Sequence, residues 1–456
     1  MTFSSAESST FSEPSKSVLR RAIAASAVGN MAEWYDYGAY AYVASEIGRH
    51  FFPGNHQTLF TMLVFAVSFV LRPLGGIIWG VIGDRRGRRF SLTVTILLIS
   101  AATFCMGLLP TYGSVGILAP ILLIGLRVIQ GLSTGGEYGG AATFMAEYAP
   151  DRRRGFYGSF LEVGTISGFT LAVLVVAGTE HVIGAEAMSD WGWRVPFLLG
   201  GPLGLIGFYL RNRLEDTPVF RELERTEDTA RRATGIAREL LTVYRRQLLA
   251  LAGLTIALNV ANYTLVAYLP TYLQATIGLS STQTDVLVIT GQAIMIFFLP
   301  AAGLLSDRIG RKPVWWISLV GLFILVTPMY LLMTAGFGWA VLAFAILASV
   351  YLLQLGTVSA MFPAIFPAHV RYAGFAISYN VATALFGGTA PAVNDWLIGS
   401  TQNAMAPAFY MMGAFVIGMI ALRFVPETRG CSLRGRSIPG LQPSHQADAM
   451  APSRTI

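Results

Sequence analysis

The stretch GVIGDRRGRR, residues 80–89, has a counterpart in GLLSDRIGRK, residues 303–312. The shared positions keep the same spacing, so that Gly80, Asp84, Arg85, Gly87 and Arg88 match Gly303, Asp307, Arg308, Gly310 and Arg311. Glycine lets two helices approach closely and lets a loop turn tightly. An aspartate can accept hydrogen bonds from the amino end of a helix or from an arginine across the molecule. We interpret the two copies as matching latches; the alternative is that their arginines only orient the chain in a membrane.

The sequence on either side of these stretches is strongly apolar. Of the 456 residues of the whole chain, 54% are hydrophobic and 12% are charged, and this charged fraction is about half that of a soluble domain. Apolar runs of about 20 residues recur, and each is long enough to cross a hydrocarbon layer about 30 Å thick. Runs such as LVFAVSFVL, residues 63–71, lack the alternation of membrane β-strands. The sequence therefore predicts an all-α membrane protein, and its net charge of +7 lies in short loops and does not indicate nucleic acid.

The apolar runs predict twelve membrane-spanning helices, at residues 22–46, 58–82, 90–110, 116–145, 156–178, 193–211, 248–274, 284–305, 313–335, 338–362, 372–397 and 404–425. Every second loop is rich in arginine and lysine: 83–89, 151–154, 306–312, 369–371 and the tail after Arg423. The loops between them carry almost none, apart from Arg49 and Arg194. Basic loops stay in the cytoplasm, so both termini are predicted to be cytoplasmic. The polar segment up to about residue 17 lacks a cleavable signal pattern, so the first span is expected to be retained.

A fainter repeat supports a division of the chain into two halves. Pro150 and Arg154 in APDRRRG match Pro367 and Arg371 in FPAHVRY, after the fourth predicted span of each half. Two parallel repeats of six helices related by pseudo-twofold symmetry are expected. The predicted organisation is a disordered amino-terminal segment (1–19), a six-helix half (20–211), a cytoplasmic linker (212–247), a second six-helix half (248–426) and a cytoplasmic tail (427–456).

The stretch NMAEWYDYGAYAY, residues 30–42, places two carboxylates among aromatic rings inside the first predicted span. Helical spacing predicts that five of its side chains share one face, with Trp34 to the side: Asn30, Glu33, Asp36, Tyr37 and Tyr40. A carboxyl group inside a membrane faces a cavity or a partner. Removal from water favours the neutral form, so such a group can carry a proton near neutral pH. Glu33 and Asp36 are thus candidates for proton or substrate binding; the alternative is a structural ion pair with Arg72 or Arg127.

Further charged residues lie within the predicted spans: Arg72, Arg127, Glu137 and Glu162. The glycine-rich run GLSTGGEYGGA, residues 131–141, lacks the lysine and hydroxyl residue of a phosphate-binding loop, so it predicts close helix packing. ATP hydrolysis is not expected, and a proton gradient is the expected energy source, without a cofactor. Cys105 and Cys431 have no metal-ligand spacing. No arrangement of nucleophile and base is found, so the chain is not predicted to be an enzyme.

Several stretches resemble the metabolite:proton symporter family of the major facilitator superfamily: GNMAEWYDYGAY, RPLGGIIWGVIGDRRGRR, RVIQGLSTGGEYGGAATFMAEYAPDRRRGFYGSF and DWGWRVPF. The resemblance covers about residues 20–427. Within that family the chain is similar to the proline/glycine-betaine proton symporters, through Glu162, LNVANYTLVAYLPTYL (258–273), FPAHVRYAGFAISYN (366–380) and STQNAMAPAFY (400–410). The resemblance implies a major facilitator fold and proton-coupled uptake of an osmoprotectant by alternating access. The tail after Glu427 has no heptad pattern, so osmotic sensing is not part of this expectation.

A betaine or proline carries a cationic nitrogen, which aromatic faces bind, and a carboxylate, which an arginine binds. The substrate-binding residues expected on this basis are Trp34, Tyr37, Tyr40, Arg72, Arg127, Asn259 and Tyr263. The acids expected to couple transport to protons are Glu33, Asp36, Glu137 and Glu162.

Other cargoes stay open on the sequence alone. Symport of an organic acid such as 2-oxoglutarate, citrate or shikimate is one of them. The resemblance leads us to expect a lysine at position 127 in osmolyte transporters and an arginine in organic-acid transporters, and this chain has Arg127. Drug efflux is another, but residues 156–178 lack the proline that exporters carry there. A transporter-like sensor is a third. The expected partners are protons, a small zwitterion or organic acid, and the lipid of a bacterial cytoplasmic membrane, with no nucleic acid and with the chain acting as a monomer.

Overall fold

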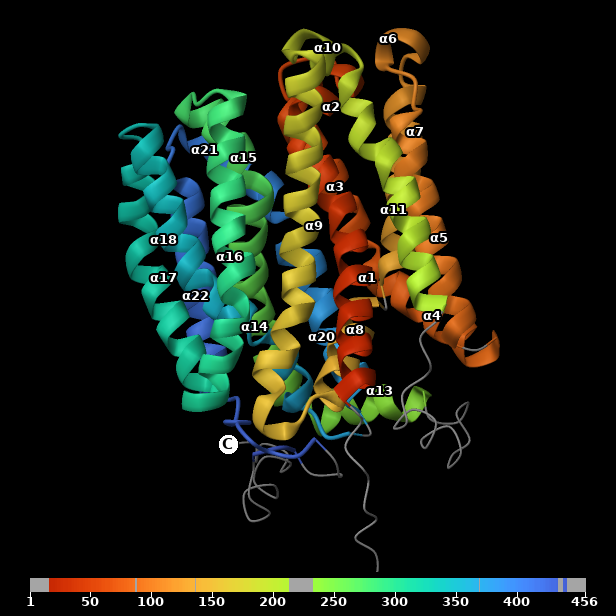
Figure 1. Cartoon of the computed structure of the whole chain (residues 1–456), viewed down its shortest axis with the longest axis vertical. Coiled ribbons are helices and arrows are strands. Elements are labelled where there is room, and N and C mark those ends of the chain that lie inside the picture. The colour runs from red at the N-terminus through yellow and green to blue at the C-terminus, as the bar shows by residue number, and fades with distance from the viewer. Residues whose placement is uncertain are drawn as a thin grey trace, which may run out of the picture.

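The computed structural model describes the backbone of residues 16–86, 88–135, 137–212, 233–368, 370–433 and 438–440. It describes the side chains of residues 19, 23–24, 26–79, 94–135, 138–139, 141–143, 145–147, 149–209, 238–368, 370–433 and 438–440. Every regular element in these ranges is helical (Figure 1). We refer to residues 16–212 as the amino half and to residues 233–440 as the carboxyl half.

The amino half contains α1 (Lys16–Tyr42), α2 (Ala44–Phe51), α3 (Gln57–Val70), α4 (Arg72–Arg86), α5 (Arg88–Gly107), α6 (Tyr112–Val115), α7 (Leu118–Thr134), α8 (Glu137–Tyr148), η1 (Asp151–Arg153), α9 (Arg154–Ile183), α10 (Ala185–Asp190), η2 (Gly192–Arg194) and α11 (Val195–Asn212). Helix α1 packs against α9 and α11, and α5 packs against α11 and α7. These contacts surround the polar residues of α1 with helices rather than with solvent.

The carboxyl half contains α13 (Ala233–Thr242), α14 (Arg245–Asn262), η4 (Tyr263–Tyr268), α15 (Leu269–Tyr272), η5 (Leu273–Ile277), α16 (Ser281–Ile309), α17 (Arg311–Met333), α18 (Phe337–Leu355), α19 (Val358–Met361), η6 (Pro363–Ile365), α20 (Arg371–Ala382), η7 (Thr383–Gly387), α21 (Ala390–Thr401) and α22 (Ala406–Arg423). Helix α17 packs against α18 and α22, and α14 packs against α22 and α20. Helix α16 packs along α9 of the amino half, and the two helices lie side by side where the two halves meet (Figure 1).

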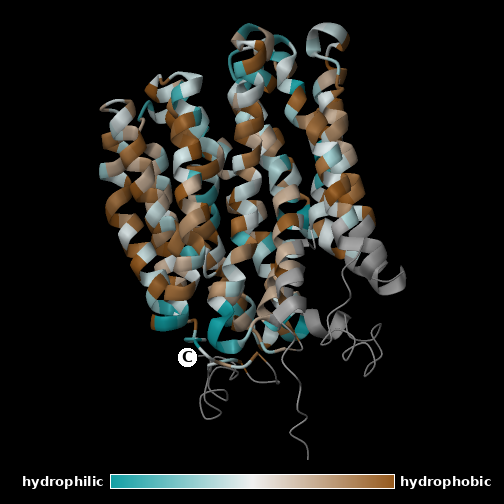
Figure 2. Cartoon of the chain, in the orientation of Figure 1, coloured by the Kyte–Doolittle hydropathy of each residue, from teal (hydrophilic) through white to brown (hydrophobic). Residues whose placement is uncertain are grey.

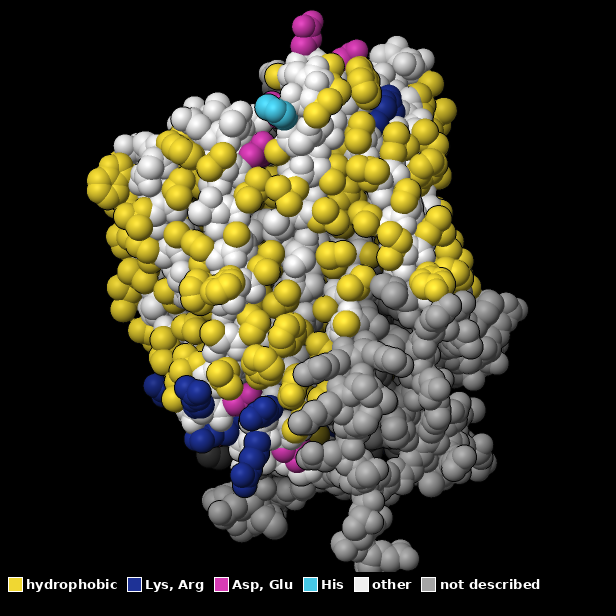
Figure 3. Space-filling model, in the orientation of Figure 1, with side chains coloured by type: hydrophobic (Ala, Val, Ile, Leu, Met, Phe, Trp, Pro, Cys, Tyr) yellow, Lys and Arg dark blue, Asp and Glu magenta, His cyan; other side chains and the backbone are white. Residues whose placement is uncertain are grey.

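Apolar residues predominate along the helices (Figure 2), and apolar side chains cover much of the described surface on the face that Figure 3 shows. Among the described residues, seven helical stretches are long and apolar enough to cross a membrane: Gln57–Trp79, Asp151–Ile183, Arg245–Ile277, Ser281–Ile309, Arg311–Met333, Phe337–Met361 and Ala406–Arg423. Large apolar side chains such as Phe297 and Leu249 are mostly exposed. A surface of this kind is suited to contact with lipid tails rather than with water.

One end of the bundle gathers the basic residues (Figure 3). We call it the basic end. It includes Arg152 and Arg153 before α9, and Arg308, Lys312, Arg423 and Arg429 around the ends of α16, α17 and α22. Elements α2, α6 and α10 lie at the opposite end (Figure 1). Residues 151–154, residues 306–312 and the segment after Arg423 meet at the basic end, as the charge pattern of the loops predicts.

The expected spans are interrupted at several places. One span was predicted over 116–145, but the structure has two helices there, α7 and α8. Gly131 and Gly135 lie directly on the backbone of the chain at Ser68 and Arg72, where a Cβ atom would collide with a carbonyl oxygen. This contact confirms the close packing predicted for the glycine-rich run. In the carboxyl half, η4, η5 and η7 are turns of π-helix, which hydrophobic periodicity does not reveal because each turn inserts a single residue.

Candidate functional site

A small cavity that several polar residues line lies between the two halves. It is lined by Trp34, Tyr138, Glu162 and Thr165 from the amino half and by Leu258, Asn259, Asn262, Tyr351, Leu355 and Tyr379 from the carboxyl half. The volume of the cavity is about 10 Å³, which is about enough for one water molecule. The structure is therefore closed around this cavity.

Glu162 on α9 is the only acid among the residues that line the cavity, and only 1% of its surface is exposed. The hydroxyl of Tyr138 donates a hydrogen bond to Glu162 Oε1 at 2.5 Å, and Thr165 also bonds this carboxyl. The ring of Tyr138 stacks on Tyr379 of the carboxyl half, with 4.7 Å between ring centroids and an interplanar angle of 18°. Glu162 thus lies beside a pair of rings that spans both halves.

Trp34 forms another wall of the cavity, and Asn30 orients it. Trp34 Nε1 donates a hydrogen bond to Asn30 Oδ1 at 3.1 Å. The amide of Asn30 donates in turn to Leu161 O at 2.8 Å and to Thr165 Oγ1 at 2.7 Å. Because Asn30 holds both Trp34 and Thr165, it couples the indole on α1 to the hydroxyl that bonds Glu162 on α9.

The carboxyl half contributes amide groups to the cavity. Asn259 Nδ2 donates to Thr383 Oγ1 at 2.6 Å, at the first residue of the π-helical turn η7. Asn262 Oδ1 is buried and makes no hydrogen bond to any described residue. The next residue, Tyr263, begins the π-helical turn η4 and turns its ring toward Trp34, with 6.3 Å between centroids. Asn262 is therefore the amide left to receive a further polar partner.

The predicted site residues divide into two groups in the structure. Trp34, Glu162 and Asn259 line the cavity, whereas seven other predicted residues do not: Glu33, Asp36, Tyr37, Tyr40, Tyr263, Arg72 and Arg127. The side chain of Glu137 lies outside the described residues. The side chains of the first copy of the repeated motif also lie outside them, at Gly80, Asp84, Arg85, Gly87 and Arg88.

Arg72 lies on the far side of Trp34 in a box of rings. Its Cζ is 4.6 Å from the ring centroid of Phe69, 5.0 Å from that of Tyr37 and 5.9 Å from that of Trp34. Its Nη2 is 3.8 Å from Glu33 Oε1. The Nε and Nη2 atoms make no hydrogen bond to any described residue. Arg72 is thus a buried cation with donors left over, which ion pairing at 3.8 Å alone does not satisfy.

Asp36 belongs to a separate buried network inside the amino half. Thr103 Oγ1 lies 2.6 Å from Asp36 Oδ1, and Gln130 Nε2 donates to Asp36 Oδ2 at 2.5 Å. Arg127 Nη1 donates to Gln130 Oε1 at 2.9 Å, and its Cζ lies 3.7 Å from the ring centroid of Tyr40. The amide of Gln130 therefore links the acid on α1 to the arginine on α7.

The residues predicted to share one face of α1 meet several different neighbours in the structure. Asn30 bonds α9, Asp36 bonds α5 and α7, Tyr37 bonds Thr134 on α7, and Tyr40 bonds Thr61 on α3. None of these residues, nor Glu33, lines the cavity, whereas Trp34, placed to the side by the helical spacing, does. The reason is that α1 is enclosed by several helices, so each part of its polar arc meets a different neighbour.

Several residues of the two sites are not indicated by any pattern that the sequence prediction used. They are Tyr138, Thr165, Asn262, Tyr351 and Tyr379 at the cavity and Thr103 and Gln130 beside Asp36. The cavity residues come from α8, α9, α14, α18 and α20, and no local pattern shows that these helices meet. A weak signal was present in RVIQG, residues 127–131, where an amide follows a buried arginine by one helical turn.

The residues of the second predicted latch join the two halves at the basic end. Asp307 accepts hydrogen bonds at 2.9 Å from the backbone N–H groups of Gly155 and of Phe156, at the amino end of α9. Arg311 Nη2 donates to the same carboxylate at 2.8 Å. A helix amino end has unsatisfied N–H groups and attracts negative charge. Gly303 lies directly on Gly155, where a Cβ on either residue would collide with the carbonyl oxygen of the other.

Asp307→Asn is expected to loosen the basic end, because a neutral amide attracts helix N–H groups less strongly than a carboxylate. A loss of about 1.4 kcal/mol corresponds to a roughly tenfold larger open fraction. The measurement is the alkylation rate of a cysteine placed at Ser359, which is 1% exposed next to α9, in protein with Cys105 and Cys431 replaced by serine. Asp190→Asn, at the opposite end, is the control. An alkylation rate equal to that of the control would contradict the latch.

The carboxyl-terminal segment, which follows Arg423 and includes Glu427, Cys431 and Leu433, also joins the two halves at the basic end. Glu427 accepts hydrogen bonds at 3.0 Å from the backbone N–H groups of Arg311 and Lys312, at the start of α17. Arg154 Nη2 donates to Cys431 O at 3.1 Å, and Arg371 Nη2 donates to Leu433 O at 2.6 Å. Arg154 and Arg371 are the arginines matched by the fainter sequence repeat, and each Nε bonds the carbonyl eight residues earlier.

The halves also meet between the cavity and the opposite end. Gln292 on α16 is fully buried; its Nε2 donates to Tyr42 Oη at 2.5 Å, and its Oε1 accepts from Thr170 Oγ1 at 2.9 Å. Farther out, Ser281 Oγ donates to Glu180 Oε2 at 2.8 Å. Because contacts between the halves lie on both sides of the cavity, the described residues are in a conformation closed at both ends.

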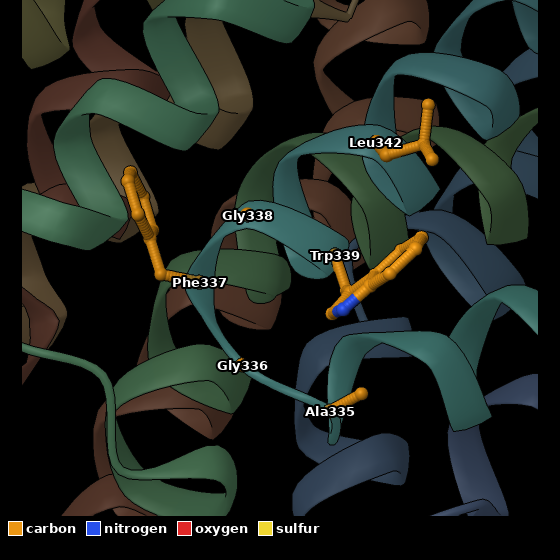
Figure 4. Close-up of a pocket in the computed structure, with 6 residues that line it drawn as sticks. All are labelled: Ala335, Gly336, Phe337, Gly338, Trp339 and Leu342. Atoms are coloured by element: carbon orange, nitrogen blue, oxygen red, sulfur yellow. The ribbon is translucent and has the colours of Figure 1, made fainter.

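A larger hollow of about 450 Å³ lies at the surface of the opposite end, where α17 meets α18 (Figure 4). It is lined by Ala335, Gly336, Phe337, Gly338, Trp339 and Leu342. None of these residues carries a charge, and Trp339 is about half exposed. The hollow has no group that could hold a charged ligand, so the polar cavity between the halves is the candidate site.

Comparison with known proteins gives relatives over nearly the whole chain. The chain is 43% identical to the glycine betaine/proline/ectoine/pipecolic acid transporter OusA of Dickeya dadantii, over 91% of this chain and 85% of that protein. It is 41% identical to the proline/betaine transporter of Escherichia coli K12, with the same coverage. Among solved structures, that of the proton:xylose symporter XylE with bound 6-bromo-6-deoxy-D-glucose superposes with a TM-score of 0.72 at 19% identity, covering 92% of this chain and 98% of that one.

The family model of the Major Facilitator Superfamily matches residues 26–392 and, in a second match, residues 262–444. The helical bundle, its apolar flanks and the likeness in fold to XylE agree with this match. The chain belongs to the Major Facilitator Superfamily, and it is a multi-pass membrane transporter rather than an enzyme.

Proposed function

We propose that this chain takes up a small zwitterionic osmolyte, of the proline and glycine betaine class, together with protons. The relatives named for betaine and proline support the substrate class. Proton coupling is supported by the buried carboxyl groups of Asp36 and Glu162, because acids inside membrane helices are typical of proton relays in transporters. The observation that carries the proposal is that Glu162, the one acid among the residues that line the cavity, lies beside stacked rings between the halves.

The cationic end of the substrate is assigned to Glu162 and the rings around it. A quaternary or secondary ammonium group is attracted to aromatic faces, with a gain of about 0.5–2 kcal/mol each. Trp34, Tyr138 and Tyr379 supply such faces from three helices, and Glu162 supplies the compensating charge. Without that charge a desolvated cation would be strongly disfavoured.

The carboxylate end is assigned to Asn262 and Arg72. Asn262 lines the cavity, and its –NH₂ group can donate to a carboxylate. Arg72 has spare donors behind Trp34, so it can bind a carboxylate when Trp34 moves and the cavity widens. A dicarboxylate fits less well, because none of the lining residues is basic and Glu162 would repel it. Arg127, which favoured an organic acid from the sequence, does not line the cavity. One of its nitrogens donates to Gln130 and its guanidinium lies over the ring of Tyr40, while its Nε and Nη2 atoms bond no described residue.

The proton is assigned to Asp36. This acid is 3% exposed and does not line the cavity, so it does not compete with Glu162 for the substrate cation. Its neighbours Thr103 and Gln130 hold it between α5 and α7. Glu33, next to Arg72, is assigned an electrostatic role at the carboxylate end of the site.

The transport cycle is assigned to movement of the two halves about the cavity. We place twelve spans in the membrane, with the basic end and both termini in the cytoplasm, in line with the preference of arginine and lysine for that side. The halves at 20–211 and 248–426, joined by the linker 212–247, then expose the cavity alternately, and the chain works as a monomer. The contacts of Asp307 and of Gln292 close the two ends in turn.

The test is uptake into proteoliposomes that contain purified protein, with an imposed pH gradient, acidic outside. We expect labelled glycine betaine or proline to accumulate above its outside concentration, and an uncoupler to abolish the accumulation. Unlabelled glycine betaine, proline and ectoine should compete, and 2-oxoglutarate, citrate and shikimate should not. Accumulation that only the organic acids inhibit would refute the assigned substrate class.

A further inference from the structure

Thr103 stands between two acceptors and can serve only one of them at a time. Its Oγ1 lies 2.6 Å from Asp36 Oδ1 and 2.9 Å from Ile99 O, the carbonyl one turn earlier on α5. A threonine hydroxyl has one hydrogen to donate and can also accept. Both distances are within hydrogen-bond range, so the hydroxyl can turn from one acceptor to the other without movement of the backbone.

The orientation of the Gln130 amide is fixed by its neighbours. Arg127 has only donors, so the group of Gln130 that faces it at 2.9 Å must be the carbonyl oxygen. The –NH₂ group therefore faces Asp36 Oδ2 at 2.5 Å and Thr103 Oγ1 at 3.0 Å. The amide can donate to Asp36 but cannot accept from it, so Thr103 is the neighbour that can accept a proton-bearing Asp36 hydroxyl.

Packing holds Thr103 in this position. A Cβ atom at Gly200 on α11 would lie only 2.5 Å from Thr103 Cγ2, so the methyl group of the threonine fills the space that the glycine leaves. With the methyl group confined, the oxygen stays directed at Asp36 and Ile99, and only the hydroxyl hydrogen is free to turn.

We propose that the Thr103 hydroxyl is the switch that lets Asp36 gain and lose a proton without leaving a buried polar group unpaired; this rests on the proposed role of Asp36 in proton coupling. With Asp36 ionised, Thr103 and Gln130 both donate to the carboxylate. With Asp36 protonated, its hydroxyl donates to Thr103 Oγ1, and the hydrogen of Thr103 turns to Ile99 O. The only bond to hydrogen that forms or breaks is that of the transported proton, and Thr103 is a positioning residue.

Few other charged or titratable groups face Asp36. Asp36 interacts electrostatically with Arg127 on α7 and with Tyr35, the preceding residue of α1. Tyr35 is itself held by a hydrogen bond of 2.8 Å from its hydroxyl to Pro196 O. The described side chains that α5 and α11 place next to Asp36 are uncharged. Thr103 is therefore the flexible hydrogen-bonding group of this network.

The test compares Thr103→Val with Thr103→Ser and with a matched control, in the full-length protein reconstituted in proteoliposomes. Valine keeps the shape and removes the hydroxyl. Because bonds to a charged group are stronger than bonds to a neutral one, the ionised form of Asp36 loses more than the protonated form. We expect the external pH at which glycine betaine uptake falls to half its maximum to rise by about one pH unit in Thr103→Val. Thr103→Ser should restore the wild-type profile.

Thr255→Val is the control, because Thr255 is fully buried and its hydroxyl donates to Leu251 O at 2.8 Å within its own helix. Each rate is divided by the amount of folded protein in the membrane, and Thr103→Ala replaces Thr103→Val if the latter does not fold. A profile of Thr103→Val equal to the wild type would overturn the switch, as would a Thr103→Ser profile equal to that of Thr103→Val. Failure of the wild type itself to respond to a pH gradient would refute the proposed function instead.

Discussion

Asp36→Asn is expected to abolish accumulation of substrate while it leaves exchange of substrate across the membrane measurable. An asparagine resembles the protonated acid: its oxygen can accept from Gln130 Nε2, and its –NH₂ group can donate to Thr103 Oγ1. A carrier that behaves as permanently protonated can move loaded between the two sides but cannot use a pH gradient. One pH unit is worth a factor of about ten for each proton, so a gradient of two units can drive about 100-fold accumulation in the wild type.

The measurement uses proteoliposomes with an imposed pH gradient of two units, followed by exchange of labelled for unlabelled glycine betaine at equal pH. The accumulation ratio of Asp36→Asn should fall to about one, while its exchange signal stays above that of empty liposomes. Asp395→Asn is the control, because Asp395 accepts a long hydrogen bond of 3.5 Å from Tyr268 in the carboxyl half, far from the network. If Asp36→Asn still concentrates substrate, the proton is carried by another acid.

Glu162→Gln is expected to weaken substrate binding itself, by roughly 10- to 100-fold. The carboxylate is the only charge among the lining residues that can compensate a substrate cation, and charge-assisted interactions of this kind are worth about 1.5–3 kcal/mol. Unlike Asp36→Asn, this variant should lose exchange and uphill uptake together at low substrate concentration. The direct measurement is the dissociation constant for glycine betaine, determined by calorimetry or by thermal stabilisation of the purified protein.

The control for Glu162→Gln is Glu46→Gln, because Glu46 bonds Arg49 at the surface and is remote from the cavity. A substrate affinity of Glu162→Gln equal to that of the control would show that Glu162 does not face the substrate cation. A normal affinity combined with loss of uphill uptake would instead move the proton from Asp36 to Glu162.

The sequence predicted the superfamily and the position of some key residues, because these depend on patterns along the chain. The repeat around Asp307 and the loop charges are such patterns. Trp34 and Glu162 stand out as an aromatic residue and an acid in otherwise apolar spans, and Asn259 lies in a stretch that resembles the osmolyte symporters; all three line the cavity.

The neighbours of these residues could not be predicted, because they come from helices that meet only in three dimensions. Tyr138, Tyr351 and Tyr379 look like ordinary aromatic residues of apolar helices, yet they approach Glu162 from α8, α18 and α20. Helical spacing placed Asp36 toward the substrate, but the helices around α1 surround it with Thr103 and Gln130. The π-helical turns next to Asn262 and at Thr383 also shift the register that a regular helix predicts.

The carboxyl-terminal segment at the basic end has a kinetic consequence. Cys431 O is bonded by Arg154 of one half and Leu433 O by Arg371 of the other. When the halves separate at this end, the segment cannot keep both bonds, so it adds to the activation barrier of opening without touching the substrate. Substitutions there would change the turnover number while the affinity stays constant, and a protein fused directly after this segment could alter the speed of a carrier whose binding site is intact.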